Sequence, residues 1–307
     1  LHTVTSWPWR TSSCTRARPL NWVPPITRTR MTSPSSPIVL RPRSSVETLA
    51  HVVCWGHGHI PPRGCDTLSG MGTWWINGEL VPGDEASLSI TDHGLTVGDG
   101  CFETTTIVRG VPFAMRRHLA RLRHSLSGLG IDLAMTDEAL RDAAQMVADA
   151  NPEHHVLRFT VTAGPGPLGS GRGDSAPSVF IGSSPSRGWP PSAAVVTVPW
   201  LRNERGALAG IKSTSYAENV VALAHATAQG ASEAIFANTI GNLCEGTGTN
   251  IFVELEGRLV TPPLSSGCLA GVTRALVVES MAVEELDVPI EILQTTTERF
   301  SRRRPAT

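Results

Sequence analysis

The hydrophobic residues between positions 73 and 183 recur first at strand spacing and then at helix spacing. Short apolar runs bounded by turn residues predict strands at 74–81, 87–90, 100–108, 155–162 and 178–182. Asn77-Gly78 is typical of a tight hairpin turn, so the first of these runs is expected to fold back on itself. Leucines three and four residues apart predict a helix over 112–129, and a second helix over 136–150 is expected to begin at the capping hydroxyl of Thr136.

The second half of the chain repeats this alternation. Apolar runs predict strands at 194–199, 234–238, 250–255 and 258–261, the last two joined by a turn at Glu256-Gly257. Helix-spaced residues predict helices over 216–229 and 271–285. Strands interleaved with helices in both halves predict an α+β fold with a small domain at 73–183, a Pro/Ser/Gly-rich linker at 184–192 and a larger domain at 193–307.

Residues 1–70 differ in composition from the rest of the chain. Glu47 and Asp66 are their only acids, and prolines and arginines are frequent without a sustained hydrophobic period. A segment of this kind cannot bury enough apolar surface to order itself. The chain begins with Leu, and Met71 stands just before the first patterned strand. We therefore expect residues 1–70 to be a disordered or spurious extension.

Composition and charge exclude several classes of protein. The 307 residues carry a formal net charge of −1, which argues against a general binder of nucleic acid or of membrane surfaces. An ordinary transmembrane helix needs about 18 or more consecutive apolar residues, and no such run occurs. The six cysteines are scattered, which favours a reducing cytoplasm over a disulfide framework. Cys54, His57, His59 and Cys65 do not have the spacing of a common zinc site, so no metal is expected.

The basic residues are distributed very unevenly between the two types. The 26 consist of 25 arginines and a single lysine, Lys212. Arginine replaces lysine wherever only positive charge matters, but a guanidinium does not lose its proton in proteins and cannot attack a carbonyl. A lone lysine is therefore a candidate nucleophile, with chance in an Arg-rich composition as the alternative. Lys212 stands in the loop before the helix predicted at 216–229, where partial burial would lower its pKa.

Three other segments supply groups that suit the same chemistry. Glu245 stands in a Gly-rich bend before a hairpin, and residues 261–274 form a small-residue bend that opens a helix. The free N–H groups at such a helix start can bind a phosphate, as can Arg121 on the helix predicted at 112–129. Each also has an ordinary structural explanation: a surface carboxylate, a bare helix cap and a surface arginine. Together with the lysine, a carboxylate and a phosphate seat are what pyridoxal 5′-phosphate requires.

The segment Glu245 to Arg274 (EGTGTNIFVELEGRLVTPPLSSGCLAGVTR) resembles the signature of the class IV aminotransferase family, and the similarity extends over about residues 73–297. This resemblance implies the two-domain α+β architecture of fold-type IV pyridoxal-phosphate enzymes, with the cofactor between the domains. It implies that Lys212 bonds covalently to the cofactor aldehyde and that Glu245 faces the pyridine nitrogen. Arg121 would clamp the phosphate, and Val272 and Thr273 would complete its seat. Family members are typically homodimers that act on small-molecule amines, so a homodimer is expected.

The branch of the family is less sharply defined. Gly98 to Thr104 and Gly169 to Gly173 are most similar to aminodeoxychorismate lyases, which release pyruvate from 4-amino-4-deoxychorismate to give 4-aminobenzoate for folate synthesis. The segment 261–274 is equally similar to branched-chain aminotransferases, so a transaminase of branched-chain or D-amino acids is the alternative. Transaminases of the branched-chain type usually have a tyrosine five residues after the lysine, whereas Tyr216 stands four after Lys212.

The chain differs from the family pattern in two places. The family continues with a strand and a threonine-containing turn where this chain has Thr295 to Arg304, so we expect the larger domain to be truncated. The family also lacks a leader like residues 1–70. A truncated end opens a third possibility, a relic without catalytic activity.

Overall fold

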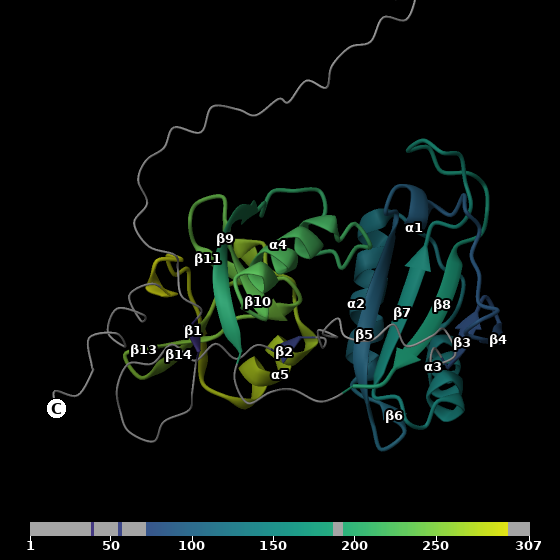
Figure 1. Ribbon diagram of the computed structural model, residues 1–307, viewed down its shortest axis with the longest axis horizontal. Helices are drawn as coiled ribbons and strands as arrows, with labels where there is room; N and C mark the ends of the chain where they lie inside the picture. The colour runs from purple at the N-terminus through teal and green to yellow at the C-terminus, as the bar shows by residue number, and fades with distance from the viewer. Residues whose placement is uncertain (1–37, 40–54, 57–71, 187–192, 294–307) are drawn as a thin grey trace, which may run out of the picture. The chain divides into compact units, whose positions relative to one another are not determined.

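The computed structural model describes residues 38–39, 55–56, 72–186 and 193–293 (Figure 1). Most of the expected extension at 1–70, residues 187–192 of the expected linker and the expected truncated end at 294–307 lie outside these ranges, as do Cys54, His57, His59 and Cys65. The domain boundaries proposed from the sequence stay a prediction.

The first sheet is antiparallel throughout and contains the predicted 74–81 hairpin. Its strands follow the order β4-β3-β8-β7-β5-β6, with bounds Glu79–Pro82, Thr73–Ile76, Ser178–Ser184, Val156–Thr162, Gly100–Val108 and Val111–Pro112. Asn77 and Gly78 have φ of 48° and 117°, the left-handed values that a tight two-residue turn needs. Arg109 and Gly110 form a second turn of this kind between β5 and β6.

Two long helices belong to the same part of the chain. Helix α2 spans Met115–Leu129 and α3 spans Asp137–Ala150. Helix α2 begins three residues later than the pattern predicts, because Pro112 pairs with Ile107 as part of β6. The Thr136 hydroxyl accepts a hydrogen bond from the backbone N–H of Ala139, which confirms the predicted cap of α3.

The prediction of a strand at 87–90 is wrong. These residues form no strand, and Leu88 and Ile90 are exposed. The backbone N–H of Asp92 donates to the carbonyl of Ser89, so the chain turns and then enters the short helix α1, His93–Thr96. The Asp92 side chain caps that helix by accepting from the N–H of Gly94. Local turn chemistry therefore overrides the short apolar pattern.

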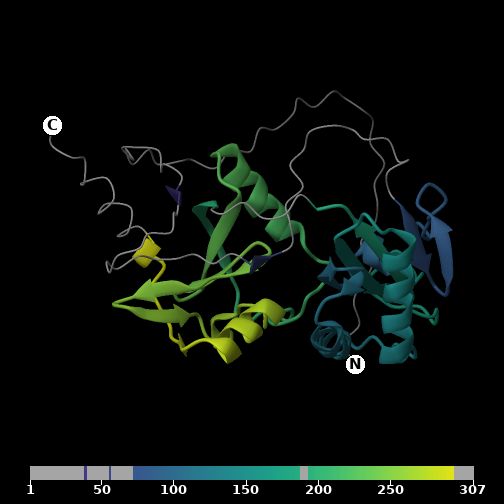
Figure 2. The same cartoon turned by 90° about the horizontal axis from the view of Figure 1, so that it is seen from below.

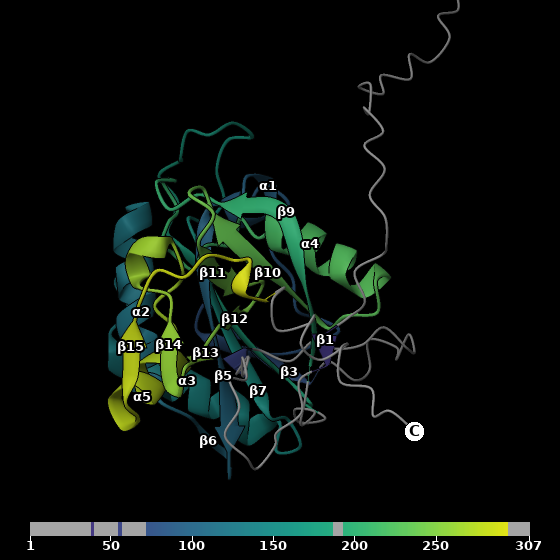
Figure 3. The same ribbon diagram turned by 90° about the vertical axis from the view of Figure 1, so that its left-hand side faces the viewer.

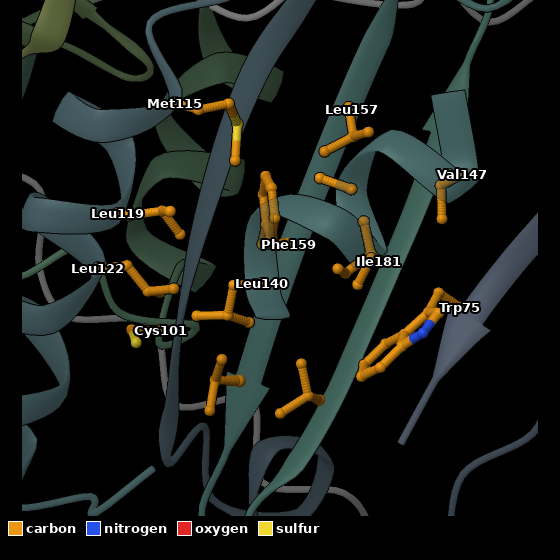
Figure 4. Close-up of a cluster of buried hydrophobic side chains, with 14 of the residues drawn as sticks. Trp75, Cys101, Met115, Leu119, Leu122, Leu140, Val147, Leu157, Phe159 and Ile181 are labelled. Carbon is orange, nitrogen blue, oxygen red and sulfur yellow. The ribbon is translucent and has the colours of Figure 1, made fainter. Parts of the chain in front are cut away.

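A single buried cluster joins α2, α3 and the first sheet. Leu119 and Leu122 of α2 are at most 1% exposed and pack with Leu140 of α3 and Phe159 of β7. Figure 4 shows these side chains together with Ile181 of β8. Burying each such side chain contributes about 1.5–3 kcal/mol, so this cluster holds the sheet and both helices in fixed positions.

A second sheet has the strand order β1-β9-β10-β11-β12-β2, with bounds Ile38–Val39, Ala194–Arg202, Glu233–Asn238, Leu243–Gly246, Thr249–Asn250 and Trp55–Gly56. Strands β9 and β10 are parallel, and helix α4, Ala217–Ala228, connects them and packs along both (Figures 1 and 2). Strand β10 is buried along its whole length, which explains why its four central residues, 234–237, are all apolar.

A small third sheet carries the predicted hairpin. Strands β13, Val253–Leu255, and β14, Arg258–Thr261, are antiparallel around the turn at Glu256 and Gly257. Helix α5 spans Val272–Ser280, so the prediction that it continues to residue 285 is wrong. Residues Val283–Glu285 instead form β15, which pairs in parallel with β14 (Figure 3). The edge of β14 offers backbone partners that the helical pattern alone does not reveal.

Candidate active site

The loop that carries Lys212 is tied to the first sheet. The backbone N–H of Phe102 donates to the Lys212 carbonyl at 3.0 Å, and the N–H of Thr214 donates to the Gly100 carbonyl at 2.8 Å. The N–H of Lys212 itself donates to the Ser125 hydroxyl on α2 at 3.2 Å. The bonds to Phe102 and Gly100 pair the loop with the start of β5 through one antiparallel bridge, and together with the bond to Ser125 they fix the lysine backbone from two sides.

The amine of Lys212 lies in a buried and largely aromatic environment. The residue is 4% exposed, and its Nζ is 4.5 Å from the ring centroid of Phe102 and 5.7 Å from that of Tyr216. Burial, assisted by the nearby Arg121 guanidinium, lowers the pKa of Lys212 to about 8, although Glu103 and Glu245 act in the opposite direction. A substantial share of the amine is therefore neutral near pH 8 and able to attack a carbonyl.

Glu245 is the penultimate residue of β11, at the Gly-rich bend, and both of its carboxylate oxygens have a partner. Its Oε2 accepts from the backbone N–H of Leu269 at 2.8 Å, and its Oε1 is 3.3 Å from Nε of Arg202. Burial raises the pKa of Glu245, and Arg202 acts against that rise. The carboxyl group is thus fixed in direction and has an increased tendency to share a proton with a nitrogen base.

The start of α5 is a bare helix N-terminus. Gly271 is its N-cap and has no side chain to cap it, so within the described part of the chain the first N–H groups, including those of Val272 and Thr273, have no side-chain cap. A Cβ on Gly271 would collide with the amide oxygen of Asn250, so only glycine allows this approach. An uncapped helix start with an adjacent hydroxyl suits a phosphate.

Arg121 lies beside that helix start and is held by a buried carboxylate. Its Nε and Nη2 each donate to Glu103 at 2.7 Å, and its Nη1 donates to the Ala270 carbonyl at 3.0 Å. His118 Nδ1 also bonds Glu103, at 2.7 Å. Burial would raise the pKa of Glu103, but the hydrogen bonds from Arg121 and His118 outweigh it and lower that pKa to about 2. These bonds use three of the five guanidinium N–H donors, which leaves two for a bound anion.

One cavity of about 660 Å³ brings all five predicted site residues together. Its walls include Lys212, Glu245, Arg121, Val272 and Thr273. An amine, a proton-sharing carboxylate, a guanidinium and an uncapped helix start therefore face one space large enough for a cofactor and a small substrate. These groups fit pyridoxal 5′-phosphate, which carries an aldehyde, a pyridine nitrogen and a phosphate.

Several residues at this site were missed by the sequence reasoning. Glu103 and Arg202 hold two of the predicted residues, and only the spacing of His118 and Arg121, three apart on one helix face, hinted at a shared partner. Arg158 of β7 lies with its guanidinium carbon 3.7 Å from the Phe102 ring centroid and close enough to Lys212 to lower its pKa. The hydroxyl of Tyr216, which stands four residues after Lys212, donates to the Thr247 carbonyl at 2.7 Å.

Comparison with known proteins defines the class to which this site belongs. The family model described as amino-transferase class IV matches residues 100–300, and the chain belongs to that family. Its members are pyridoxal 5′-phosphate-dependent enzymes, and so is this protein. A branched-chain aminotransferase from Thermoproteus uzoniensis, solved with norvaline, is 28% identical, has a TM-score of 0.66 and aligns over 74% of this chain and 81% of its own. The predicted fold-type IV architecture is thereby confirmed.

Curated relatives carry three different activities in their names. A protein of Methanocaldococcus jannaschii, provisionally named a branched-chain-amino-acid aminotransferase, is 34% identical over 71% of this chain and 78% of its own length. D-alanine aminotransferase from Bacillus licheniformis is 29% identical over 66% and 73%. Aminodeoxychorismate lyase from Bacillus subtilis is 27% identical over 67% and 72%. Within the residues that the structure describes, no helix is both long and apolar enough to cross a membrane.

Proposed function

We propose that this protein is an aminodeoxychorismate lyase that converts 4-amino-4-deoxychorismate to 4-aminobenzoate and pyruvate. One observation supports a catalytic centre above all: the buried Lys212 lines the same cavity as Glu245 and the start of α5. The two segments that resemble lyases also meet in space. Arg172 of the second segment donates two hydrogen bonds of 2.6 Å to Asp99 of the first.

Each residue of the site has a distinct task in this proposal. When bound, the cofactor supplies an aldehyde and a ring that withdraws electrons from the substrate. Lys212 would hold the cofactor at its aldehyde, and the free amine of Lys212 would remove the proton from the substrate carbon that bears the amino group. Glu245 keeps the pyridine nitrogen protonated, and Arg121, Val272 and Thr273 hold the phosphate. Pyruvate then leaves and the six-membered ring of the substrate becomes aromatic, so no oxidant or second substrate is needed.

We propose that Arg158, an exposed residue of β7 that lies beside the cavity but does not line it, binds a carboxylate of the substrate. Its guanidinium carbon lies over the ring of Phe102, and the Lys212 amine lies over the same ring. A guanidinium with free donors pairs with carboxylates in a bidentate manner. The two carboxylates of 4-amino-4-deoxychorismate, or the single one of an amino acid, suit this position.

The test is to incubate the cofactor-loaded protein with 4-amino-4-deoxychorismate and no keto acid, and to measure pyruvate with a coupled lactate dehydrogenase assay. We expect one pyruvate for each 4-aminobenzoate formed, and none with Lys212→Arg. If wild-type protein with bound cofactor forms no pyruvate, the lyase proposal fails.

The second candidate is a transaminase of branched-chain or D-amino acids. It is favoured by the names of the archaeal and D-alanine relatives and by the segment 261–274. In this case Lys212 moves the proton from Cα of the amino acid, and a keto acid such as 2-oxoglutarate receives the amino group. Transfer from leucine, valine or D-alanine to 2-oxoglutarate, without pyruvate from 4-amino-4-deoxychorismate, would establish it.

The family resemblance also leads us to propose a cytoplasmic homodimer. Light scattering on the purified protein tests the oligomeric state, with twice the chain mass of 32.7 kDa expected.

A further inference from the structure

Glu233 is a buried carboxylate at the start of β10 that does not line the cavity. The residue is 7% exposed. Its Oε1 accepts from the backbone N–H groups of Ala234 and Thr247, at 2.9 and 3.0 Å, and from the Thr247 hydroxyl. Its Oε2 accepts from the Thr249 hydroxyl at 3.0 Å. Burying a carboxylate costs free energy unless its oxygens accept hydrogen bonds. The four donors around Glu233 therefore stabilise the carboxylate in this buried position.

The donors belong to the bend that forms one wall of the cavity. Residues 245–250 all line that cavity, and Glu233 touches the bend from behind at Thr247 and Thr249. A Cβ at Gly246 would come within 3.0 Å of the Glu233 carboxylate and collide with the Thr249 hydroxyl. The bend is therefore wrapped around this side chain, and glycine at 246 is what permits it.

Hydrogen bonds from the bend lead to the groups that surround Lys212 and the start of α5. The Thr247 carbonyl accepts from the Tyr216 hydroxyl and from the Asn219 amide. At the ends of the bend, Glu245 accepts from the N–H of Leu269, and the Asn250 amide donates to the Leu269 carbonyl at 2.9 Å. A displacement of Thr247 would thus move both the ring that lies over Lys212 and the carboxylate at the other end of the bend.

The charge on Glu233 is balanced differently from that on Glu103. Every hydrogen bond that the described residues make to Glu233 comes from a backbone N–H or a threonine hydroxyl, all of them neutral. The carboxylate of Glu233 therefore has hydrogen-bond donors but no positively charged partner among the described residues. Burial is the main cause of the raised pKa values of Glu245 and Tyr216, and the charge of Glu233 adds a smaller contribution in the same direction. Glu103, in contrast, is neutralised by Arg121.

We propose that Glu233 is a positioning residue for cofactor binding, which fixes the bend at 245–250 from behind and so sets the places of Glu245 and Tyr216 in the cavity. It touches neither cofactor nor substrate. Its effect reaches the site through Thr247 and Thr249, and through its charge. Outer partners of metal ligands change affinity by about 10- to 100-fold when removed, and an effect at the lower end of that range is expected here.

The experiment compares Glu233→Gln with Glu284→Gln, an exposed glutamate of β15 whose only described ion pair, to Arg258, is also exposed. Three quantities are measured: the cofactor dissociation constant by absorbance titration, the melting temperature with and without cofactor, and the pH midpoint of the visible absorbance of the bound cofactor. For Glu233→Gln we expect the cofactor dissociation constant to be about tenfold larger and the rise in melting temperature on cofactor binding to be smaller. The pH midpoint of the visible absorbance should move to lower pH. Glu284→Gln is expected to change none of them.

A purely structural role gives a different result. It lowers the melting temperature of the free and the loaded protein equally and leaves the dissociation constant and the pH midpoint at wild-type values, which would overturn the proposal. If Glu233→Gln does not fold, Thr249→Val decides the matter, because it removes one donor and keeps the charge. Weaker cofactor binding in Thr249→Val supports the proposal, and unchanged binding refutes it. None of the three measured quantities depends on which substrate the enzyme uses. Failure of this proposal is therefore distinguishable from failure of the lyase assay.

Discussion

Helix α2 carries two arginines, one turn apart, that make the same type of ion pair in different surroundings. Arg121 donates two bonds of 2.7 Å to Glu103, and Arg117 donates two bonds of 2.7 Å to Glu279. Glu103 has a side chain only 1% exposed, whereas that of Glu279 is 54% exposed. Comparing the two pairs therefore tests whether burial increases the contribution of an ion pair to the free energy of unfolding.

The expected loss in Glu103→Gln follows from the structure in two ways. A pKa lowered from 4.5 to about 2 corresponds to about 3 kcal/mol of stability at neutral pH, because one unit is worth about 1.4 kcal/mol. Removing one partner of a buried ion pair costs about 3–5 kcal/mol in general, since the other charge stays buried and unpaired. We therefore expect the free energy of unfolding to fall by about 3 kcal/mol in Glu103→Gln at pH 7.

The assay is urea unfolding of the cofactor-free protein followed by tryptophan fluorescence, with Glu279→Gln as the control. Glu279→Gln is expected to unfold almost as the wild type does, because water screens an exposed pair. A folded pKa below the unfolded one gives stability that is present above pH 4.5 and lost as the pH falls toward 2. The gap between wild type and Glu103→Gln should therefore close over that range. Equal losses in the two variants at pH 7 would refute the reasoning.

Three further outcomes test the roles assigned in the cavity. Thr273→Val should weaken cofactor binding about tenfold in an absorbance titration, since hydrogen bonds to charged groups contribute about 1.5–3 kcal/mol; unchanged binding would remove Thr273 from the phosphate seat. The rate of cofactor attachment to the free protein should rise with pH and level off above about 8, because the folded pKa of Lys212 lies below the ordinary 10.5 and only the neutral amine attacks. A stopped-flow profile that keeps rising to pH 10 would contradict that. Arg158→Met should raise KM for a carboxylate substrate about tenfold while kcat changes little, and a loss confined to kcat would exclude carboxylate binding as its role.

Much of the fold was predictable because its elements have strong local signals. The hairpin at Asn77-Gly78, the long strand β5 and the Thr136 cap each depend on residues close together in the sequence. One of the errors lies where a distant partner decides, and the other where a local turn overrides a short apolar pattern. Residues 283–285 become a strand because β14 is there to pair with, and residues 87–90 turn because Asp92 and Ser89 bond across one turn.

The candidate site was predictable in part for a similar reason. Lys212 stands out as the only lysine of the chain, and the segment from Glu245 to Thr273 carries a recognisable motif. Glu103, Arg202 and Glu233 carry no such signal, because their importance comes from contacts across the fold. A carboxylate on a strand has the same sequence appearance whether it faces solvent or holds an arginine 18 residues away.

The central claim is that the amine of Lys212 bonds covalently to the cofactor, and borohydride reduction of the loaded protein followed by peptide mass spectrometry tests it most directly. The result we predict is a phosphopyridoxyl mass increase on the peptide that contains Lys212, and none in Lys212→Arg. Reduction that leaves Lys212 unmodified while the cofactor remains bound would contradict the account.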